Sequence, residues 1–469
     1  MPEIKLTNVT TIINGKINKV NILVSNGIIK QITKGEIRDN ISTVINCQDK
    51  IVIPGGIDGH MHTEAPFQGM TGGLSFYEQS IIAASGGTTT FIDFTNTTKH
   101  SSLYDKYNER IEQMKVSAID YAVHGKIVEV NNHVLDDIKK MVNEGCTSFK
   151  FFMTYKNEGV MCNEEDIIKL FKFAAEEKIL CMVHAESDMI ANYNLEQLKL
   201  KNKLDWLHFP EYKPVICELD AFQHIINLAK ITGVQLLIVH TTNKECIDYY
   251  IKQCINKKIK NIHVETCPHY LLLTEELLKS SDGFLAIGSP PLRTRRDNIA
   301  LINAIKNRTI EILGSDDCSF TVQEKQHFIK NGNTITHDFT RVVNGVSGME
   351  IRLHVLLKVL GITPDDISEL PNLVRVFSEN PARIYGLFPE KGFIREGSDA
   401  DLVIIDLHKN FNIYNSITYK RFGYTLYHNF SSSGIIETVI LRGNIIINKG
   451  IFTGKSMGGN YLKRKHPDL

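Results

Sequence analysis

The 469-residue sequence lacks the marks of a membrane, secreted or nucleic-acid-binding protein. No apolar run approaches the roughly 18 to 20 residues that a membrane-spanning helix needs. The opening segment, MPEIKLTNVTTIINGKINK, contains no apolar stretch typical of a secretion signal, so we expect a cytoplasmic protein. Lys and Arg together number 53, as do Asp and Glu, and this balance gives no reason to expect nucleic acid or a membrane surface as a partner.

Paired cysteines are also missing. The nine cysteines form no CxxC pair, and several, such as Cys146 and Cys181, lie within apolar runs. An odd, unpaired set of this kind is typical of reduced cysteines in the core of an intracellular protein. We therefore predict free, buried cysteines.

What is present is a change of rhythm along the chain. Residues 3–50 alternate apolar and polar side chains and contain two Asn-Gly turn signals, which predicts a small antiparallel sheet. After residue 51, short apolar runs alternate with helical periodicity, as in 164–178 and 219–233, which is typical of a parallel sheet covered by helices. Eight runs favour an α/β fold of the (β/α)8 barrel type over an open sheet. They span 51–58, 88–94, 121–128, 148–153, 179–185, 235–241, 261–267 and 311–316.

Strand-like alternation returns from about Pro389, in KGFIREGSDADLVIID and GIIETVILRGNIIINKG. About 50 residues alone bury little core and leave sheet edges exposed, so we expect both chain ends to build one smaller β domain. Two separate β extensions are the alternative. The predicted division is 1–52 for the N-terminal part of the β domain, 53–388 for the barrel, and 389–469 for the C-terminal part and tail.

Two histidines stand one residue apart in GGIDGHMHTEAP, directly after an apolar run. Side chains at i and i+2 of a strand point to the same side, so His60 and His62 can converge beyond the strand end. A pair of surface histidines on a loop is the simpler interpretation. Half of a metal site is the other.

Further metal-competent side chains fall at or near the carboxyl ends of other predicted strands, where barrels build their active sites. They are Lys150, His184, His240 and Asp316. Taken singly, each histidine could be a hydrogen-bonded core residue, and Asp316 could be a helix N-cap. Lys150 is harder to dismiss, because a lysine within an apolar strand is rarely buried without a partner. Since five strands supply such groups to one rim, we predict a single site.

A charged lysine cannot bind a metal beside four histidines. Burial favours the neutral amine, which can add carbon dioxide and become a carbamate with two oxygens. Such an anion can bridge two metal ions about 3.5 to 4 Å apart, the spacing of two-metal hydrolytic sites. The sequence therefore predicts a binuclear centre bridged by Lys150.

These motifs make the chain recognisable as similar to a known family. PGGIDGHMH, SFKFFMTYK, VHAES, ETCPHYLLL, SPPLR, GSDDCSF and NPARIYGLFPEKGFIREGSDADLVIID resemble the cyclic amidohydrolases of the amidohydrolase superfamily, above all dihydropyrimidinases and D-hydantoinases. The resemblance implies a β-sandwich for the smaller domain. It also implies two zinc ions, one held by His60, His62, carboxylated Lys150 and Asp316, the other by Lys150, His184 and His240.

The activity that this resemblance implies is opening of the cyclic amide of dihydropyrimidines or 5-substituted hydantoins to N-carbamoyl amino acids. Asp316 would act as general base and then general acid. Tyr155 would stabilise the oxyanion. Ser289 and Asn344 would mark the segments that bind the imide edge, although both residue types are also common in turns. The resemblance further implies a homotetramer, in keeping with the apolar, aromatic-containing stretch YTLYHNFSSSGIIETVIL.

Related activities are distinguished by individual residues. A dihydroorotase would carry an arginine after the histidine pair, where this chain has TEAPFQG, and Arg293 and Arg295 are the only nearby substitutes. A single-metal deaminase would have a glutamate three residues after the fifth-strand histidine, whereas Glu186 follows by two. Allantoinase or another cyclic ureide hydrolase stays open as an alternative, as does a non-catalytic dihydropyrimidinase-like binding protein.

The chain departs from its relatives at Asp317, which stands where a histidine is common. A second carboxylate close to Asp316 would raise the pKa of that group, whereas one that points away would not. Around the ring substituent of a substrate, we expect a pocket wall formed by Ala65, Phe67, Phe152 and Val160.

Overall fold

The central element of the fold is a parallel sheet. The computed structural model describes residues 3–38, 41–332, 334–454 and 457–468. Eight parallel strands follow the order β15-β14-β13-β12-β11-β10-β9-β6. Their bounds are β6 (Gly56–Met61), β9 (Thr88–Phe94), β10 (Asp120–Lys126), β11 (Ser148–Phe152), β12 (Leu180–His184), β13 (Gln235–Ile238), β14 (Ile262–Thr266) and β15 (Ile312–Leu313). The predicted α/β barrel is confirmed.

The barrel closes between β6 and β15 through a few specific contacts rather than a long ladder. The amide of His62 donates to the carbonyl of Asp317 over 2.8 Å. One guanidinium nitrogen of the fully buried Arg352 donates to the carbonyls of Ile57 (2.8 Å) and Leu313 (2.9 Å). Arg352 therefore joins the first and last strands, and the rim that carries the strand ends is held together.

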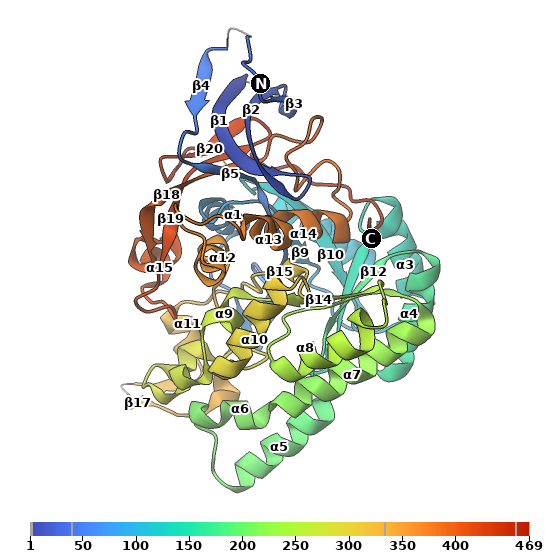
Figure 1. Cartoon of the computed structure of the whole chain (residues 1–469). Helices are drawn as coiled ribbons and strands as arrows, with labels where there is room; N and C mark the ends of the chain where they lie inside the picture. Colours follow the sequence, from blue (N-terminus) through green and yellow to red (C-terminus); the bar gives the residue numbers. More distant parts are fainter. Residues whose placement is uncertain (1–2, 39–40, 333, 455–456, 469) are drawn as a thin grey trace.

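Helices surround the barrel on the outside, with the longest of them, α7, packed beside α4 and α8 (Figure 1). Several begin at a Ser or Asn whose side chain accepts a backbone N–H, as Ser102 and Asn163 do. In α4 the buried residues Ile167, Leu170 and Ala174 recur at helical spacing and face the strands.

The helices that connect the barrel strands or follow them are α1 (Phe76–Ser85), α2 (Leu103–Met114), α3 (Asn132–Asn143), α4 (Glu164–Glu176), α5 (Asp188–Leu200), α6 (Phe209–Tyr212), α7 (Val215–Thr232), α8 (Lys244–Tyr250), α9 (Pro268–Leu272), α10 (Arg295–Lys306), α11 (Val322–Gln326), α12 (Arg352–Leu360), α13 (Leu370–Val374), α14 (Asn380–Ile384) and α15 (Ile417–Phe422). Two small hairpins complete the loops, β7 (Pro66–Phe67) with β8 (Met70–Thr71), and β16 (Lys330–Asn331) with β17 (Thr334–Ile335).

A second sheet of nine strands is built from both ends of the chain and lies beside the barrel, on the side where the N-terminus is labelled (Figure 1). Its strands are β1 (Ile4–Ile13), β2 (Lys16–Ser25), β3 (Ile28–Thr33), β4 (Thr43–Asn46), β5 (Ile51–Pro54), β18 (Leu402–Asn412), β19 (Ser431–Leu441), β20 (Asn444–Asn448) and β21 (Ile451–Phe452). β5 pairs with β18 in antiparallel register, Val52 opposite Ile404, and so joins the two ends. The prediction that both chain ends build one β region is confirmed, and the alternative of two separate extensions is excluded. The domain boundaries at 52/53 and 388/389 stay predictions.

Turn chemistry explains the start of this sheet. Asn14-Gly15 and Asn26-Gly27 connect β1 to β2 and β2 to β3, and all four residues have positive φ angles. Two successive positive φ angles are the requirement of a type I′ hairpin turn, which Asn and Gly adopt with little strain. The antiparallel arrangement predicted for the first 50 residues is correct for these hairpins.

One detail of the sequence interpretation is wrong. The run 51–58 is not one barrel strand: β5 belongs to the nine-stranded sheet and β6 to the barrel, with Gly55 between them. The stretch YTLYHNFSSSGIIETVIL, given above in keeping with a homotetramer, has a role within the chain. Most of it is buried within the chain itself, including Tyr427, Phe430 and alternate residues of β19, because it supplies a sheet strand and its core side chains.

The prediction of free, buried cysteines agrees with the structure. All nine cysteines are free, and all except Cys318 are buried. Within the described ranges, no helix combines the length and the apolar character needed to cross a membrane.

We expect Arg352→Met to destabilise the protein strongly. The change leaves Asp58, 3.6 Å from the guanidinium, without its buried countercharge and frees two buried carbonyls. Loss of one partner of a buried pair typically costs about 3–5 kcal/mol. Urea unfolding measures this cost. Arg296→Met is the control, because its exposed pair with Glu245 is worth at most about 1 kcal/mol. Equal unfolding midpoints for the two variants would contradict the closing role of Arg352.

Candidate active site

Six side chains singled out by sequence meet at the carboxyl rim of the barrel. They are His60 in β6, His62 just after it, Lys150 in β11, His184 at the end of β12, His240 after β13 and Asp316 after β15. All six line one cavity, because the carboxyl ends of parallel strands share one edge of the sheet.

Four of these side chains form a close group around one carboxylate. Nε2 of His60 lies 3.2 Å from Oδ1 of Asp316, and Nε2 of His62 lies 3.3 Å from the same oxygen. Nζ of Lys150 lies 3.3 Å from Nε2 of His60. The nitrogen and oxygen atoms that can bind a cation therefore face one another.

The remaining two histidines form an adjoining group. Nε2 of His240 lies 2.9 Å from Nδ1 of His184. The ring of His240 stacks on that of His60, with 5.4 Å between centroids. His60, His240 and Asp316 each offer a ligand atom within 4.8 Å of the others. The two groups are thus parts of one site.

Two buried carboxylates hold the imidazoles from behind. Oε1 of Glu265, in β14, lies 2.6 Å from Nδ1 of His60. Oε2 of Glu186 lies 2.6 Å from Nε2 of His184. An acceptor on one ring nitrogen fixes the tautomer and presents the other nitrogen, as an acceptor, to the site. His60 thereby presents Nε2 and His184 presents Nδ1.

Burial dominates the protonation of the site. It lowers the pKa of Lys150 to about 8, against the opposing charges of Asp316 and Glu265. It lowers the pKa of His184 to about 4. Burial also disfavours the charged form of Asp316, but His60 and His62 outweigh it and hold the pKa of that carboxyl well below its usual range. The site thus combines an amine whose pKa is lowered toward neutrality, three imidazoles (His62, His184 and His240) whose pKa values are lowered by burial, and an ionised carboxylate.

This donor set fits divalent metal ions. Neutral imidazoles and an ionised carboxylate are the ligands that zinc prefers, and the carboxylates behind the rings complete the usual second layer. A different acidic cluster, Asp120 with Asp399 and Asp401, is not comparable. The ammonium of Lys391 already lies 2.5 to 2.8 Å from all three of its carboxylates.

The cavity beside the donor set encloses about 1040 Å³, including the part open to solvent. That volume suits a small ring with a substituent. Its apolar wall includes the four residues expected from sequence, Ala65, Phe67, Phe152 and Val160.

The three other predicted site residues, Tyr155, Ser289 and Asn344, also line this cavity. Tyr155 adopts a positive φ of 68° and packs its ring 5.5 Å from that of His184. Burial raises the pKa of its phenol, and Lys213, Ser289 and Asn344 oppose that shift. A buried phenol with a raised pKa remains protonated and able to donate a hydrogen bond.

Comparison with known proteins agrees with this geometry. Residues 51–446 match the amidohydrolase family, which is most of the chain. The chain belongs to the amidohydrolase family. It is 33% identical over 466 residues to the D-phenylhydantoinase of Escherichia coli O81 (strain ED1a), with 95% of each sequence covered.

Solved structures of similar proteins extend the match to the whole fold. The crystal structure of dihydropyrimidinase from Brevibacillus agri NCHU1002 superposes with a TM-score of 0.92 at 28% identity, over 99% of both chains. A crystal structure of a D-hydantoinase gives a TM-score of 0.91 at 30% identity, also over 99% of both chains. The family predicted from the sequence motifs is confirmed.

Asp317 does not act on Asp316 in this amidohydrolase. Its Oδ1 accepts hydrogen bonds from Gln79 (2.9 Å) and Ser319 (2.7 Å), and its Oδ2 accepts from the amides of Gly348 (2.9 Å) and Met349 (3.1 Å). The carboxylate is therefore committed to joining the eighth-strand loop to α1 and to the 347–349 loop. Asp317, which stands where relatives commonly have histidine, therefore connects loops of the fold, and within the described structure its carboxylate forms no hydrogen bond to the six side chains of the site.

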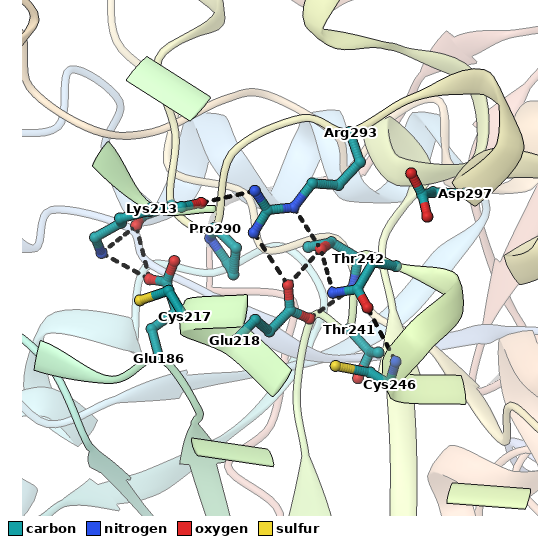
Figure 2. A network of polar contacts seen from close by, with 12 residues as sticks. Glu186, Lys213, Cys217, Glu218, Thr241, Thr242, Cys246, Pro290, Arg293 and Asp297 are labelled. Carbon is teal, nitrogen blue, oxygen red and sulfur yellow. Dashed lines mark hydrogen bonds and ion pairs between the residues drawn. The ribbon is translucent and has the colours of Figure 1, made fainter. Parts of the chain in front are cut away.

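The two arginines considered as carboxylate partners are not available to the cavity. Arg293 is buried, and its guanidinium donates to Thr242 (3.1 Å), to the carbonyl of Lys213 (2.7 Å) and to Glu218 (3.3 Å), as Figure 2 shows. Arg295 is exposed at the start of α10. Neither residue lines the cavity.

Sequence reasoning missed Glu265 and Lys213 and gave Glu186 no role. Glu265 had a usable signal, since a glutamate within the apolar run NIHVETC raises the same question as Lys150 in its strand. Lys213 had none, because it lies in an ordinary polar stretch between α6 and α7. Only the folded chain brings it to the barrel rim.

Proposed function

We propose that this amidohydrolase opens the ring of hydantoins or dihydropyrimidines by hydrolysing a cyclic amide to an N-carbamoyl amino acid. The observation that carries the proposal is the meeting of six donor side chains in one cavity of a protein related throughout its length to a D-phenylhydantoinase. In this proposal one zinc ion is held by His60, His62, Lys150 and Asp316, and a second by Lys150, His184 and His240.

Carboxylation of Lys150 completes the ligand set. The neutral amine forms a bond to the carbon of carbon dioxide and loses one proton, which leaves a carbamate with two oxygens and one negative charge. The low pKa of the amine supports this step, as does the lack of any ion pair to Lys150 among the described residues. A bridging anion also offsets the positive charge that two divalent ions bring into a buried site.

Each polar residue of the cavity then has one task in the reaction. Two divalent ions held by these residues would lower the pKa of a water between them toward about 7 and polarise the substrate carbonyl. Asp316 accepts the proton of the attacking water and delivers it to the ring nitrogen as the C–N bond breaks. Tyr155 donates its hydroxyl proton in a hydrogen bond to the carbonyl oxygen as that oxygen becomes negative. Ser289 and Asn344 bind the remaining imide edge of the ring.

Selectivity for a neutral ring follows from the charges around the cavity. A carboxylate on the substrate would be costly to bury without a cationic partner. The loop of residues 63–67 supplies no cation, and Arg293 is used within the protein. Besides Lys150, the cavity is lined by Lys126, and burial lowers its pKa to about 8, which makes it a weaker partner for a carboxylate. Dihydroorotate is therefore disfavoured.

The alternatives differ in what they leave unexplained. A non-catalytic binding protein would not need all six donors, their carboxylate supports and a buried Tyr155 in one cavity. Allantoinase activity needs the same metal donors and differs in the ring, so it stands as the second candidate. We retain a cytoplasmic location and a homotetramer as parts of the proposal, on the family resemblance and the unpaired cysteines.

A substrate panel tests the function. We expect kcat/KM for hydantoin, a 5-substituted hydantoin or dihydrouracil to exceed that for dihydroorotate by at least about 100-fold, since an unpaired buried charge costs several kcal/mol. Chromatography of the N-carbamoyl product measures each rate. Allantoin as the best substrate would support the second candidate, and dihydroorotate as the best would contradict the proposed branch of the family.

Replacement of Lys150 tests the binuclear centre. Wild-type protein purified without chelator should contain about two divalent ions per chain. Lys150→Ala should lose most of its metal and all measurable activity because the bridging anion is missing, and short carboxylic acids should restore part of both. Metal analysis and turnover measure the two effects.

Lys126→Ala is the matched control for this change. Lys126 pairs with Lys150 across β10 and β11, lines the same cavity and also has a pKa lowered to about 8 by burial. No contact to a histidine is found for Lys126 in the described structure, so this variant should keep two metal ions. Equal metal loss in both variants would show that neither lysine is a specific ligand.

Tyr155→Phe tests oxyanion stabilisation. Removal of one such donor typically lowers kcat about 10²- to 10³-fold. Metal content should not change, since the phenol is not among the proposed ligands. Tyr212→Phe is the control, because Tyr212 lies nearby but outside the main cavity. If Tyr155→Phe loses no more activity than Tyr212→Phe, the tyrosine is a packing residue.

A further inference from the structure

A buried ion pair lies directly behind His184. Nζ of Lys213 is 2.6 Å from Oε2 of Glu186, and the two side chains are 1% and 0% exposed. Figure 2 shows the pair at the end of a polar network that continues through the Lys213 carbonyl to Arg293 and Glu218. Transfer of two charges out of water is costly even when they pair. A fold that needed only a filled core would place apolar side chains here.

One oxygen of Glu186 is the meeting point of three donors. Oε2 accepts from Nε2 of His184 (2.6 Å), from Nζ of Lys213 (2.6 Å) and from the hydroxyl of Ser289 (3.0 Å). The other oxygen, Oε1, is buried without a hydrogen-bond partner in the described structure. All the hydrogen bonds to the Glu186 carboxylate are thus made by Oε2, and these three donors set its orientation.

Lys213 extends the same cluster to the substrate side of the cavity. Its ammonium donates to Oγ of Ser289 over 2.6 Å. It also lies 4.5 Å from the ring centroid of Tyr155, within cation–π range. Lys213 comes from the segment between α6 and α7, Ser289 from the segment after η4 (Gly283–Ala286), and Tyr155 from the loop after β11. Three segments distant in sequence are therefore tied to one ammonium group.

We propose that Glu186 and Lys213 are a positioning pair that couples a metal ligand to the substrate contacts. This inference rests on the proposed function. Glu186 holds the ring of His184 so that Nδ1 faces His240, and Lys213 holds Ser289 and the ring of Tyr155 at the other side of the cavity. Neither residue touches the reacting atoms. Each acts through the groups that do.

The two halves of the pair predict different losses. Glu186→Gln keeps the size of the side chain but weakens the hydrogen bond to His184, so zinc affinity should fall about 10- to 100-fold. Lys213→Met removes the donor to Ser289, so KM for hydantoin should rise about 10-fold or more, with a smaller effect on zinc affinity. Lys213→Arg keeps a charged donor and should recover most of the KM.

Lys391→Met is the matched control. Lys391 is also a buried lysine that forms ion pairs with carboxylates, among them Asp120 at the first residue of β10. That residue lies at the amino end of its strand, opposite the active-site rim. The control should lose thermal stability while zinc affinity and KM stay at wild-type values.

The experiment measures zinc affinity of each metal-free variant by competition with a chromogenic chelator, and kcat and KM separately on the reloaded enzyme. The inference is supported if Glu186→Gln loses zinc affinity, Lys213→Met raises KM, and Lys213→Arg recovers KM. It is overturned if both variants bind zinc and substrate like wild type and differ only in stability, as the control does.

The measurement of zinc affinity tests this inference independently of the proposed function. If the wild-type enzyme opens no ring, the proposed function fails, and the zinc affinity of Glu186→Gln relative to Lys391→Met still decides the role of Glu186. If Glu186→Gln does not fold, the double variant Glu186→Gln, Lys213→Gln carries the zinc measurement, because it leaves no unpaired buried charge.

Discussion

Burial of the Lys150 amine at the rim of the barrel is the constraint on which the rest of the site depends. A strand of the central sheet carries this side chain to a place where it is only 1% exposed and where burial disfavours the charged form. Charged, the amine would repel any cation bound to the histidines beside it. Neutral, it is a nucleophile that can become an anion. The histidines and Asp316 surround this amine, and its burial determines whether it is charged or can react.

Carboxylates behind the imidazoles supply the second requirement, which is orientation. A histidine has two ring nitrogens, and it can bind a metal only through the nitrogen that carries no proton. Glu265 settles this for His60, and Glu186 does so for His184. Both carboxylates are buried, so each has to be compensated. Glu186 is compensated by Lys213, and through that ammonium His184 is connected to Ser289.

The scaffold positions these groups through long-range closure. Arg352 joins the two ends of the eight-stranded sheet, and β5 carries the chain from the nine-stranded sheet into the barrel one residue before β6 begins. His60 in β6 and His62 just after it are therefore fixed from both sides. A loose first strand would misplace two of the six donors at once, because both stand on the same short segment.

The sequence by itself determined the fold class and singled out the six side chains that meet at the rim, since each depends on a local pattern. Periodicity distinguishes strands from helices, and His60, His62 and Lys150 stand out against apolar neighbours. The tertiary structure alone decided which polar groups support them. Lys213 has no local signal, and the pairing of Glu265 with His60 joins residues 205 positions apart. The same holds for Asp317, whose carboxylate turns to Gln79 and the 347–349 loop, and for Arg293, which the network around Glu218 withdraws from the cavity. The pattern of residues along the chain indicates which side chains are buried. The partner of a buried charge depends on which groups lie close to it in the folded structure.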